Sequence, residues 1–208
     1  MEKKALLVIV AGFAGSGKST LADKLAKALK AKCVHASGVL KEMRKKKAAK
    51  IDLHACRHNT GWWESEEGKA YMRRRLEDST MDKELDKHLL KLIAQAKKKK
   101  QALVLDSWTM PWLSKEGFKI WLRASAEKRA GRIAGRDGIP AADALKKLRE
   151  RDAQTAQIYK NIYGFSLGED LRPFNLVIET DELDEEGVFA EALGEVKKVI
   201  DVNSGKRK

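Results

Sequence analysis

Cysteine and long apolar runs are scarce in this 208-residue sequence. Cys33 and Cys56 are its two cysteines, too few for a disulfide framework, so we expect a protein of the reducing cytoplasm. No apolar stretch approaches the roughly 18 residues that a membrane span requires, so we expect no membrane partner. The four histidines accompany no nucleophile motif, which argues against a Ser-His-Asp hydrolase. With 43% hydrophobic and 35% charged residues, the composition is typical of a globular enzyme.

Acidic residues are outnumbered by basic ones. There are 43 Lys and Arg against 30 Asp and Glu, a net charge of +13. Such a surplus suits a polyanionic partner, either nucleotide phosphates or RNA. The lysine runs at residues 45–47 and 97–100 lack the interleaved aromatic residues of a base-stacking surface. We therefore favour solvated lysine-rich helix faces, and nucleic acid is the less favoured partner.

Short apolar runs alternate with segments of helical periodicity. Runs without polar alternation are typical of strands buried on both faces of a sheet, and they occur at residues 5–11 and 102–106. We expect three further short strands at 32–35, 118–122 and 175–179. Helical spacing of apolar residues follows the first run up to about residue 32 and recurs at 82–98, 126–135, 142–162 and 185–199. This order implies right-handed βαβ crossovers. We predict an α/β fold with a five-stranded parallel sheet flanked by helices.

Two stretches are less regular. Residues 39–80 are rich in charge and are interpreted as a mostly helical insertion, preceded by a turn at Ser37-Gly38. A second turn is expected at Met110-Pro111.

The segment from Gly12 to Ser19 matches the phosphate-binding pattern G-x-x-x-x-G-K-[ST], after a strand and before a helix. Its glycines allow a backbone that turns several N–H groups inward at the positive end of a helix. Lys18 can reach the β- and γ-phosphates of a nucleoside triphosphate, and the Ser19 hydroxyl can ligate Mg²⁺. We therefore expect ATP as donor and Mg²⁺ as its metal. The predicted donor-binding residues are Gly12, Ala14, Gly15, Ser16, Gly17, Lys18, Ser19 and Thr20.

Asp106 ends the predicted strand 102–106. A carboxylate at the carboxyl edge of a buried strand faces the phosphates in folds of this kind. We predict that Asp106 joins Ser19 in positioning Mg²⁺, directly or through water. The alternative is an aspartate that caps its own turn through Ser107 and Thr109.

Arginines gather between residues 129 and 151. Arg129, Arg132 and Arg136 share one face of a predicted helix, and Arg149 and Arg151 follow. Phosphoryl transfer develops negative charge that cations on a closing lid can neutralise. The alternative is a set of surface arginines paired with neighbouring acidic residues. The predicted catalytic residues are Lys18, Asp106, Arg132, Arg136, Arg149 and Arg151.

Several segments together resemble one known family. They are the phosphate loop, Asp82-Lys83-Glu84-Leu85-Asp86, Ile120-Trp121-Leu122, residues 127–136 (EKRAGRIAGR), Arg149-Glu150-Arg151, Ile162-Tyr163-Gly164 and Leu176-Val177-Ile178. In this order, over about 170 residues, they are similar to archaeal-type cytidylate kinases of the nucleoside monophosphate kinase group and the P-loop superfamily. The resemblance implies a phosphotransferase that uses ATP to phosphorylate CMP or dCMP. It also implies that Arg132 and Arg136 are lid arginines and that Arg149 and Arg151 clamp the transferred phosphate.

The resemblance further implies a domain layout. Residues 1–202 form a single kinase domain with its core in 1–36 and 101–202 and an acceptor-binding insertion at about 37–100. A short lid spans about 132–148, and residues 203–208 form a basic tail. We expect a monomer.

The acceptor side departs from the family pattern. Asp106-Ser107-Trp108 stands where the family usually has a Gly-Arg pair, and Ile158 where an arginine would be expected. Arginines of the insertion (Arg44, Arg57, Arg73, Arg74 and Arg75) could rebuild a phosphate clamp. The predicted acceptor-binding residues are Ser37, Lys41, Arg44 and Trp108.

Two other functions stay open at this point. A nucleoside or other hydroxyl acceptor must lose a proton, and Asp106 could serve as its base. A protein of another class, an NTP-dependent RNA-binding or ribosome-assembly factor, would account for the basic charge.

A zinc site is also suggested by His54, Cys56 and His58. A structural zinc site has four protein ligands, and here the fourth would have to come from a distant residue such as Cys33 or His35. We favour a chance spacing.

Overall fold

The computed structural model describes residues 5–45 and 66–203 and contains a five-stranded parallel sheet in the order β2-β3-β1-β4-β5. The strands are β1 (Leu7–Gly12), β2 (Lys32–His35), β3 (Leu103–Asp106), β4 (Phe118–Arg123) and β5 (Leu176–Glu179). The predicted fold class is confirmed, and each predicted strand lies within two residues of an observed one.

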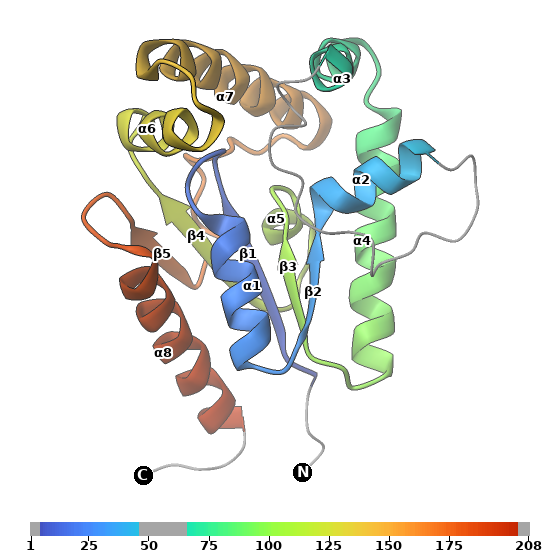
Figure 1. Ribbon diagram of the computed structural model, residues 1–208. Coiled ribbons are helices and arrows are strands. Elements are labelled where there is room, and N and C mark those ends of the chain that lie inside the picture. Colours follow the sequence, from blue (N-terminus) through green and yellow to red (C-terminus); the bar gives the residue numbers. More distant parts are fainter. Residues whose placement is uncertain (1–4, 46–65, 204–208) are drawn as a thin grey trace.

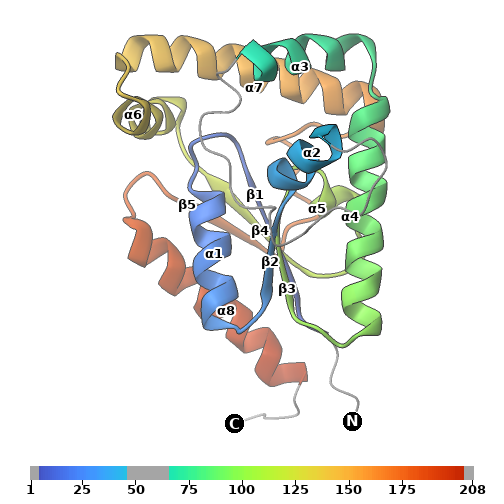
Figure 2. The ribbon, with the colours of Figure 1, turned by 45° about the vertical axis from the view of Figure 1, so that its right-hand side comes forward.

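Helices cover both faces of the sheet and its upper end (Figure 1). On one face lie α1 (Lys18–Ala28) and α8 (Glu185–Asn203), and on the other α2 (Ala36–Lys45), α4 (Thr80–Lys98) and α5 (Met110–Leu113). The helices α3 (Glu66–Glu77), α6 (Ala126–Asp137) and α7 (Ala141–Tyr163) lie beyond the carboxyl ends of the strands, as the turned view also shows (Figure 2). None of the described helices is long and apolar enough to cross a membrane.

The strands are rich in apolar residues, and β1 is apolar throughout, because both faces of the sheet are buried. Val8 and Val10 of β1 point toward α1 and α8, where they join the cluster that contains Leu25. Ile9, between them in sequence, points the other way and packs in the cluster that contains Leu89 of α4. All five side chains are fully buried. A two-sided core of this kind explains the continuous apolar runs of the sequence.

The segment 37–100 contributes to more than one part of the fold. Its helix α4 packs on the sheet, with Leu85, Leu89 and Ile93 in the same buried cluster as Ile9. Its helix α3 instead reaches α7, where Met72 joins the cluster of Trp121 and Tyr159. The described parts of the segment are helical, as predicted. Its role in acceptor binding stays a prediction.

Both expected turns are wrong. Ser37-Gly38 lies in the first turn of α2, which begins at Ala36 directly after β2. Met110-Pro111 begins the short helix α5, because a proline in the first helical turn lacks only an N–H that would have no intrahelical partner. The last helix is also longer than predicted and ends at Asn203, the first residue assigned to the tail. Outside the described residues lie the candidate zinc ligands His54, Cys56 and His58, the insertion arginine Arg57 and the tail 204–208.

An aromatic cluster joins α5 and β4 to the segment that follows α7. Trp112 stacks on Phe165 with ring centroids 4.3 Å apart, and its ring edge meets Trp121 and Phe174. Trp121 is 1% exposed. These two tryptophans are therefore core residues, and they leave Trp108 as the described tryptophan that faces a pocket.

Candidate active site

The phosphate loop joins β1 to α1 in a conformation that glycine permits. Gly15 has φ 78° and Gly17 has φ 90°, both in the left-handed region. A Cβ on Gly15 would lie 2.8 Å from the Arg129 carbonyl oxygen, whereas one on Gly17 would meet nothing within 4 Å. The loop thus packs tightly against α6 at Gly15 and opens outward at Gly17. The first N–H groups of a helix have no intrahelical acceptor, and such a helix N-terminus favours an anion.

Ser19 and Asp106 meet at the carboxyl end of the sheet. The Ser19 hydroxyl donates to Asp106 Oδ2 over 2.6 Å, and His35 Nδ1 donates to the same oxygen over 3.0 Å. The register of β2 on β3 places His35 directly beside Asp106. His35 is 3% and Asp106 5% exposed. A buried carboxylate oxygen is therefore shared by a loop serine and a histidine that the sequence analysis did not assign to the site.

Burial and pairing act in opposite directions on this group. Burial alone would raise the pKa of Asp106, but the hydrogen bond from His35 and the charge of Lys18 outweigh it and hold that pKa below its usual value of 3.8. Burial would likewise lower the pKa of His35, yet the bond to Asp106 and the contact with Cys33 raise it to about 11. Asp106 is thus held as a carboxylate and His35 as an imidazolium ion at neutral pH.

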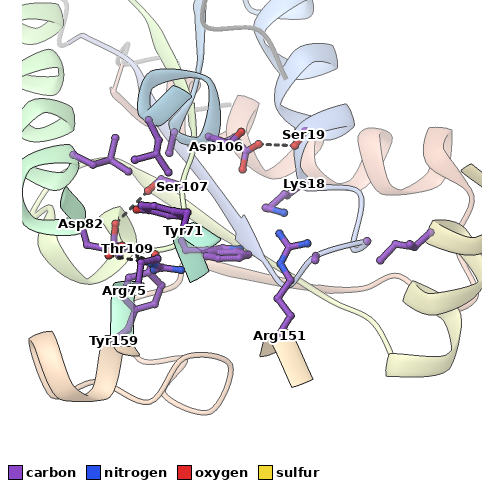
Figure 3. A pocket seen from close by; sticks show the side chains of 18 of the residues that line it. Lys18, Ser19, Tyr71, Arg75, Asp82, Asp106, Ser107, Thr109, Arg151 and Tyr159 are labelled. Carbon is purple, nitrogen blue, oxygen red and sulfur yellow. Dashed lines mark hydrogen bonds and ion pairs between the residues drawn. The ribbon is translucent and has the colours of Figure 1, made fainter. Parts of the chain in front are cut away.

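Two cations lie close to the ring of Trp108. The Lys18 ammonium and the Arg151 guanidinium each lie 5.6 Å from the centroid of its ring. The indole Nε1 donates to the Gly12 carbonyl oxygen over 2.7 Å, which fixes the ring beside the phosphate loop. Burial lowers the pKa of Lys18, and the nearby Asp106 charge offsets part of this. In Figure 3, Arg151 enters the pocket from the side opposite Ser19 and Asp106.

Two pockets meet at the phosphate loop. The first is lined by Ser37, Leu40, Tyr71, Arg75, Asp82, Trp108, Arg151 and Tyr159, among others. The second is lined by Ser16, Gly17, Thr20, Arg132, Thr180, Leu183 and Val188, among others. They share Gly15, Lys18, Ser19, Ile133 and Arg136. A phosphate held by Lys18 and Ser19 would therefore be accessible from both pockets.

The predicted lid arginines lie close to this junction. Arg132 donates to the Thr180 carbonyl oxygen over 2.7 Å and to the Thr180 hydroxyl over 3.2 Å, and it lines the second pocket. Arg136 pairs with Asp137 over 2.6 Å and lines both pockets.

The two predicted clamp arginines differ in position. Arg151 lines the first pocket. Arg149, two residues earlier on α7, is exposed and pairs with Glu127 over 2.7 Å, and it lines neither of the two pockets. Residues two apart on a helix point to different sides, so α7 presents one of these arginines to the site in this conformation.

The predicted acceptor residues are also divided. Ser37 and Trp108 line the first pocket, whereas Lys41 and Arg44 are not among its lining residues. The Arg44 guanidinium lies 5.2 Å from the ring centroid of Tyr71, which does line it. Arg44 therefore contacts a residue of the pocket wall and is not itself one of the lining residues.

The sequence analysis missed an ion pair in the wall of the first pocket. Arg75 of α3 donates from Nε and a terminal nitrogen to Asp82 of α4, at distances of 2.7–3.0 Å, and both side chains are buried. Its guanidinium lies 5.2 Å from the ring centroid of Tyr159. Asp82 stands one turn before Asp86 on the otherwise apolar face of α4. Two carboxylates on an otherwise apolar helix face were the sequence signal from which a buried ion pair could have been predicted.

Asp86 is the second member of that pair. Its oxygens accept hydrogen bonds from the Thr109 and Tyr163 hydroxyls, each over 2.6 Å. Burial raises its pKa to about 6, against the effect of these two bonds. Asp86 thereby links α4 to the segment after β3 and to the end of α7.

Arg129 anchors the phosphate loop to α6 and α7. It is 5% exposed, donates to the Ala14 carbonyl oxygen over 3.2 Å, and pairs with Asp152 over 2.7 Å. Its guanidinium also lies 5.2 Å from the Phe13 ring centroid. Its role is therefore to hold the loop in place.

A parallel sheet flanked by helices, whose first strand leads through a glycine loop into a helix, with two pockets that share the loop lysine, is the arrangement of the P-loop kinases, enzymes that transfer a phosphoryl group. Residues 8–182 match the model of the Cytidylate kinase-like family, and the chain belongs to this family. It is therefore a phosphotransferase, of the nucleoside monophosphate kinase class.

The similarity to curated cytidylate kinases extends over 93–100% of the chain. It is 32% identical to a cytidylate kinase of Pyrococcus horikoshii over 212 residues, which cover 100% of this chain and 98% of that protein. It is 31% identical to a cytidylate kinase of Methanocaldococcus jannaschii, with 93% of this chain and all of that protein covered.

Solved structures share the fold at low identity. An uncharacterized protein from Eubacterium ventriosum aligns with TM-score 0.65 and 14% identity, covering 94% of this chain and 99% of its own. A shikimate kinase from Bacteroides thetaiotaomicron aligns with TM-score 0.55 and 13% identity, covering 94% and 98%. These likenesses establish the fold alone.

Proposed function

We propose that the chain transfers the γ-phosphate of ATP to CMP or dCMP. The observation that carries the proposal is the meeting of two pockets at Lys18, Ser19 and Arg136 in a chain of the Cytidylate kinase-like family. Nucleoside monophosphate kinases need two nucleotides held with their phosphates in contact, and this junction supplies the contact point.

The donor nucleotide is assigned to the second pocket, lined by Thr20, Arg132 and Thr180. The turn Gly15–Gly17 and the first N–H groups of α1 bind its phosphates. Lys18 supplies a compact positive charge to the β- and γ-phosphates.

The residues at the end of β3 suit a hard divalent metal. Ser19 Oγ and Asp106 Oδ2 are oxygen atoms 2.6 Å apart beside the phosphate loop, and oxygen is the ligand type that Mg²⁺ prefers. Ser19 and Asp106 would hold Mg²⁺, which when bound neutralises charge on the β- and γ-phosphate oxygens. The hydrogen bond from His35 orients the carboxylate for this role.

The acceptor is assigned to the first pocket. A monophosphate is already an anionic nucleophile, so it needs positive clamps rather than a general base. Arg136 and Arg151 line the pocket beside Lys18 and can neutralise charge on the transferred group. Tyr71, Trp108 and Tyr159 offer aromatic faces for a nucleobase.

The pairing of Asp106 weighs against a hydroxyl acceptor. A general base works best with a pKa near the operating pH, whereas the pKa of Asp106 is held below 3.8. Its Oδ2 atom already accepts from Ser19 and His35. These contacts suit a carboxylate that positions a metal, and they favour a monophosphate acceptor over a nucleoside.

The test is a panel of nucleosides and nucleoside monophosphates with ATP and Mg²⁺, followed by coupled ADP formation. We expect the highest kcat/KM for CMP or dCMP, with CDP or dCDP formed in equal amount to ADP. Lys18→Ala is the control for contaminating kinases. Turnover of nucleosides but not of monophosphates would overturn the assignment. Phosphorylation of neither, with salt-sensitive RNA binding, would instead favour an RNA-associated protein.

A further inference from the structure

Three side chains with metal-binding atoms converge between α1 and β2, which is an edge strand of the sheet. Cys33 and His35 are two residues apart on β2 and so share one face. Asp23 lies one helical turn after Ser19 on α1 and faces the same strand. One ligand atom from each of the three lies within 4.8 Å of the others. None of them lines either pocket.

The separations approach those of a tetrahedral zinc site. With a Zn–N bond of about 2.0–2.1 Å and a Zn–S bond of about 2.3 Å, a tetrahedral pair of N and S ligands lies about 3.5–3.6 Å apart. The distance from Cys33 Sγ to His35 Nε2 is 3.6 Å. Asp23 Oδ1 lies 3.0 Å from the same nitrogen, whereas a tetrahedral N and O pair would be about 3.4 Å apart. The Asp23 side chain is 59% exposed and free to make this small shift.

The surroundings also fit a metal-bound histidine. The other ring nitrogen, Nδ1, donates to the buried carboxylate of Asp106 over 3.0 Å. A carboxylate in this position orients a ligating imidazole and fixes its tautomer. His35 therefore has one nitrogen committed to Asp106 and the other directed at a thiol and a carboxylate.

We propose that Asp23, Cys33 and His35 bind a thiophilic divalent transition metal of the Zn²⁺ class, with water as the fourth ligand. Nitrogen, sulfur and one carboxylate oxygen form a donor set suited to zinc rather than to Mg²⁺. Binding releases the proton of the Cys33 thiol and the proton of His35 Nε2 to solvent. The Asp106–His35 hydrogen bond remains in place.

The imidazole ring of His35 would separate the proposed zinc site from the Asp106 carboxylate. Asp106 Oδ2 contacts His35 on one side and Ser19 on the other. Occupancy by zinc would replace the proton on His35 Nε2 with a divalent charge, and Asp106 would experience that change through the ring. The metal would thus act on the position of Ser19 and Asp106 without entering a pocket.

The experiment uses the full chain, reduced with a non-thiol reductant and freed of metal by a chelator. Zn²⁺ binding is measured by calorimetry, and Co²⁺ is added separately to follow the thiolate-to-metal absorption band. Cys33→Ser and Asp23→Asn are the test variants. Cys56→Ser is the matched control, since it removes the chain's other cysteine. Circular dichroism and thermal unfolding establish that each variant is folded.

We expect one Zn²⁺ per chain and a cobalt–thiolate band in the wild type and in Cys56→Ser. Loss of an outer-shell partner weakens metal affinity about 10–100-fold, so loss of the Cys33 ligand should weaken it at least about tenfold. The band should vanish in Cys33→Ser. Unchanged affinity in a folded Cys33→Ser variant, a band that depends on Cys56, or no band in the wild type would each overturn the proposal.

Discussion

Replacing Asp106 by asparagine tests the physical core of the site. The change keeps the size of the side chain and one acceptor oxygen but removes the charge that His35 and Ser19 share. A hydrogen bond to a charged group contributes about 1.5–3 kcal/mol. Two such bonds are weakened without being abolished, so we expect the free energy of unfolding to fall by about 2–4 kcal/mol near pH 6.

The loss should depend on pH in a direction that the two pKa shifts determine. The folded pKa of Asp106 is below its unfolded value of 3.8, so its contribution is present above about pH 3.8 and is lost as the pH falls further. The folded pKa of His35 is about 11, above its unfolded value of 6.5. Its contribution is complete below pH 6.5 and declines as the pH rises toward 11.

The difference between wild type and Asp106→Asn is therefore largest between about pH 4 and pH 6.5. Above that window the wild type loses up to about 1.4 kcal/mol per pH unit, because its folded state retains a proton that the unfolded state releases. The variant lacks the partner that holds this proton, so its stability should change less, and the two should converge by about pH 9.

Urea unfolding at a series of pH values measures this convergence. Asp23→Asn is the matched control, because it removes a charge from the other side of the same imidazole and leaves the contact between Ser19 and Asp106. The control should keep most of the pH dependence of the wild type. A wild-type–variant difference that stays constant from about pH 5 to pH 9 would refute the charged His35–Asp106 pair.

Turnover of the same variant separates the two roles of Asp106. If the carboxylate positions Mg²⁺, the activity lost in Asp106→Asn should recover in part as the Mg²⁺ concentration rises. A loss of several orders of magnitude that Mg²⁺ does not offset, seen with a hydroxyl acceptor, would identify a general base instead.

Three further predictions concern the phosphate loop and the arginines. Lys18→Ala should lower kcat by about 10²–10³-fold or more, since it removes a charge directed at the transferred phosphate; near-normal turnover would contradict the assigned role. Arg151→Ala should lower kcat far more than Arg149→Ala, because the first lines the pocket and the second forms an exposed ion pair contributing about 0–1 kcal/mol to stability; steady-state kinetics on both variants checks the order. Gly15→Ala should destabilise the chain and weaken ATP binding, since its Cβ would lie 2.8 Å from a carbonyl oxygen at φ 78°. The control Gly131→Ala, in a helix with open space around it, should stabilise by up to about 1 kcal/mol in thermal unfolding.

Local patterns in the sequence predicted the sheet well, and they mark the phosphate loop plainly. A strand buried on both faces leaves a continuous apolar run, and the phosphate loop is encoded within eight consecutive residues. The turn at Ser37-Gly38 was wrong because Ser and Gly are turn formers by propensity, whereas here the chain enters α2 directly from β2. Tertiary packing of α2 on the sheet decides that local choice.

Contacts between distant segments account for what the sequence did not reveal. His35 and Asp106 are 71 residues apart and meet because β2 and β3 pair in one register. Arg75 finds Asp82 across the break between α3 and α4, and among several neighbouring arginines nothing local marks which one is buried. The acceptor side depends on such pairings, which explains why the motifs specified the donor side more fully.

The hydrogen bonds of Arg129 couple the phosphate loop to two helices. One guanidinium holds the Ala14 carbonyl and Asp152, so the phosphate loop, α6 and α7 cannot separate without breaking a partly buried ion pair. We expect the amide protons of the loop and of the first half of α6 to exchange with solvent in a single cooperative opening. A closing motion of α6 and α7 must then leave the contacts of Arg129 intact and bend the chain on the far side of this residue. A substitution that loosens the packing of α6 on α7 would weaken nucleotide binding without touching the nucleotide.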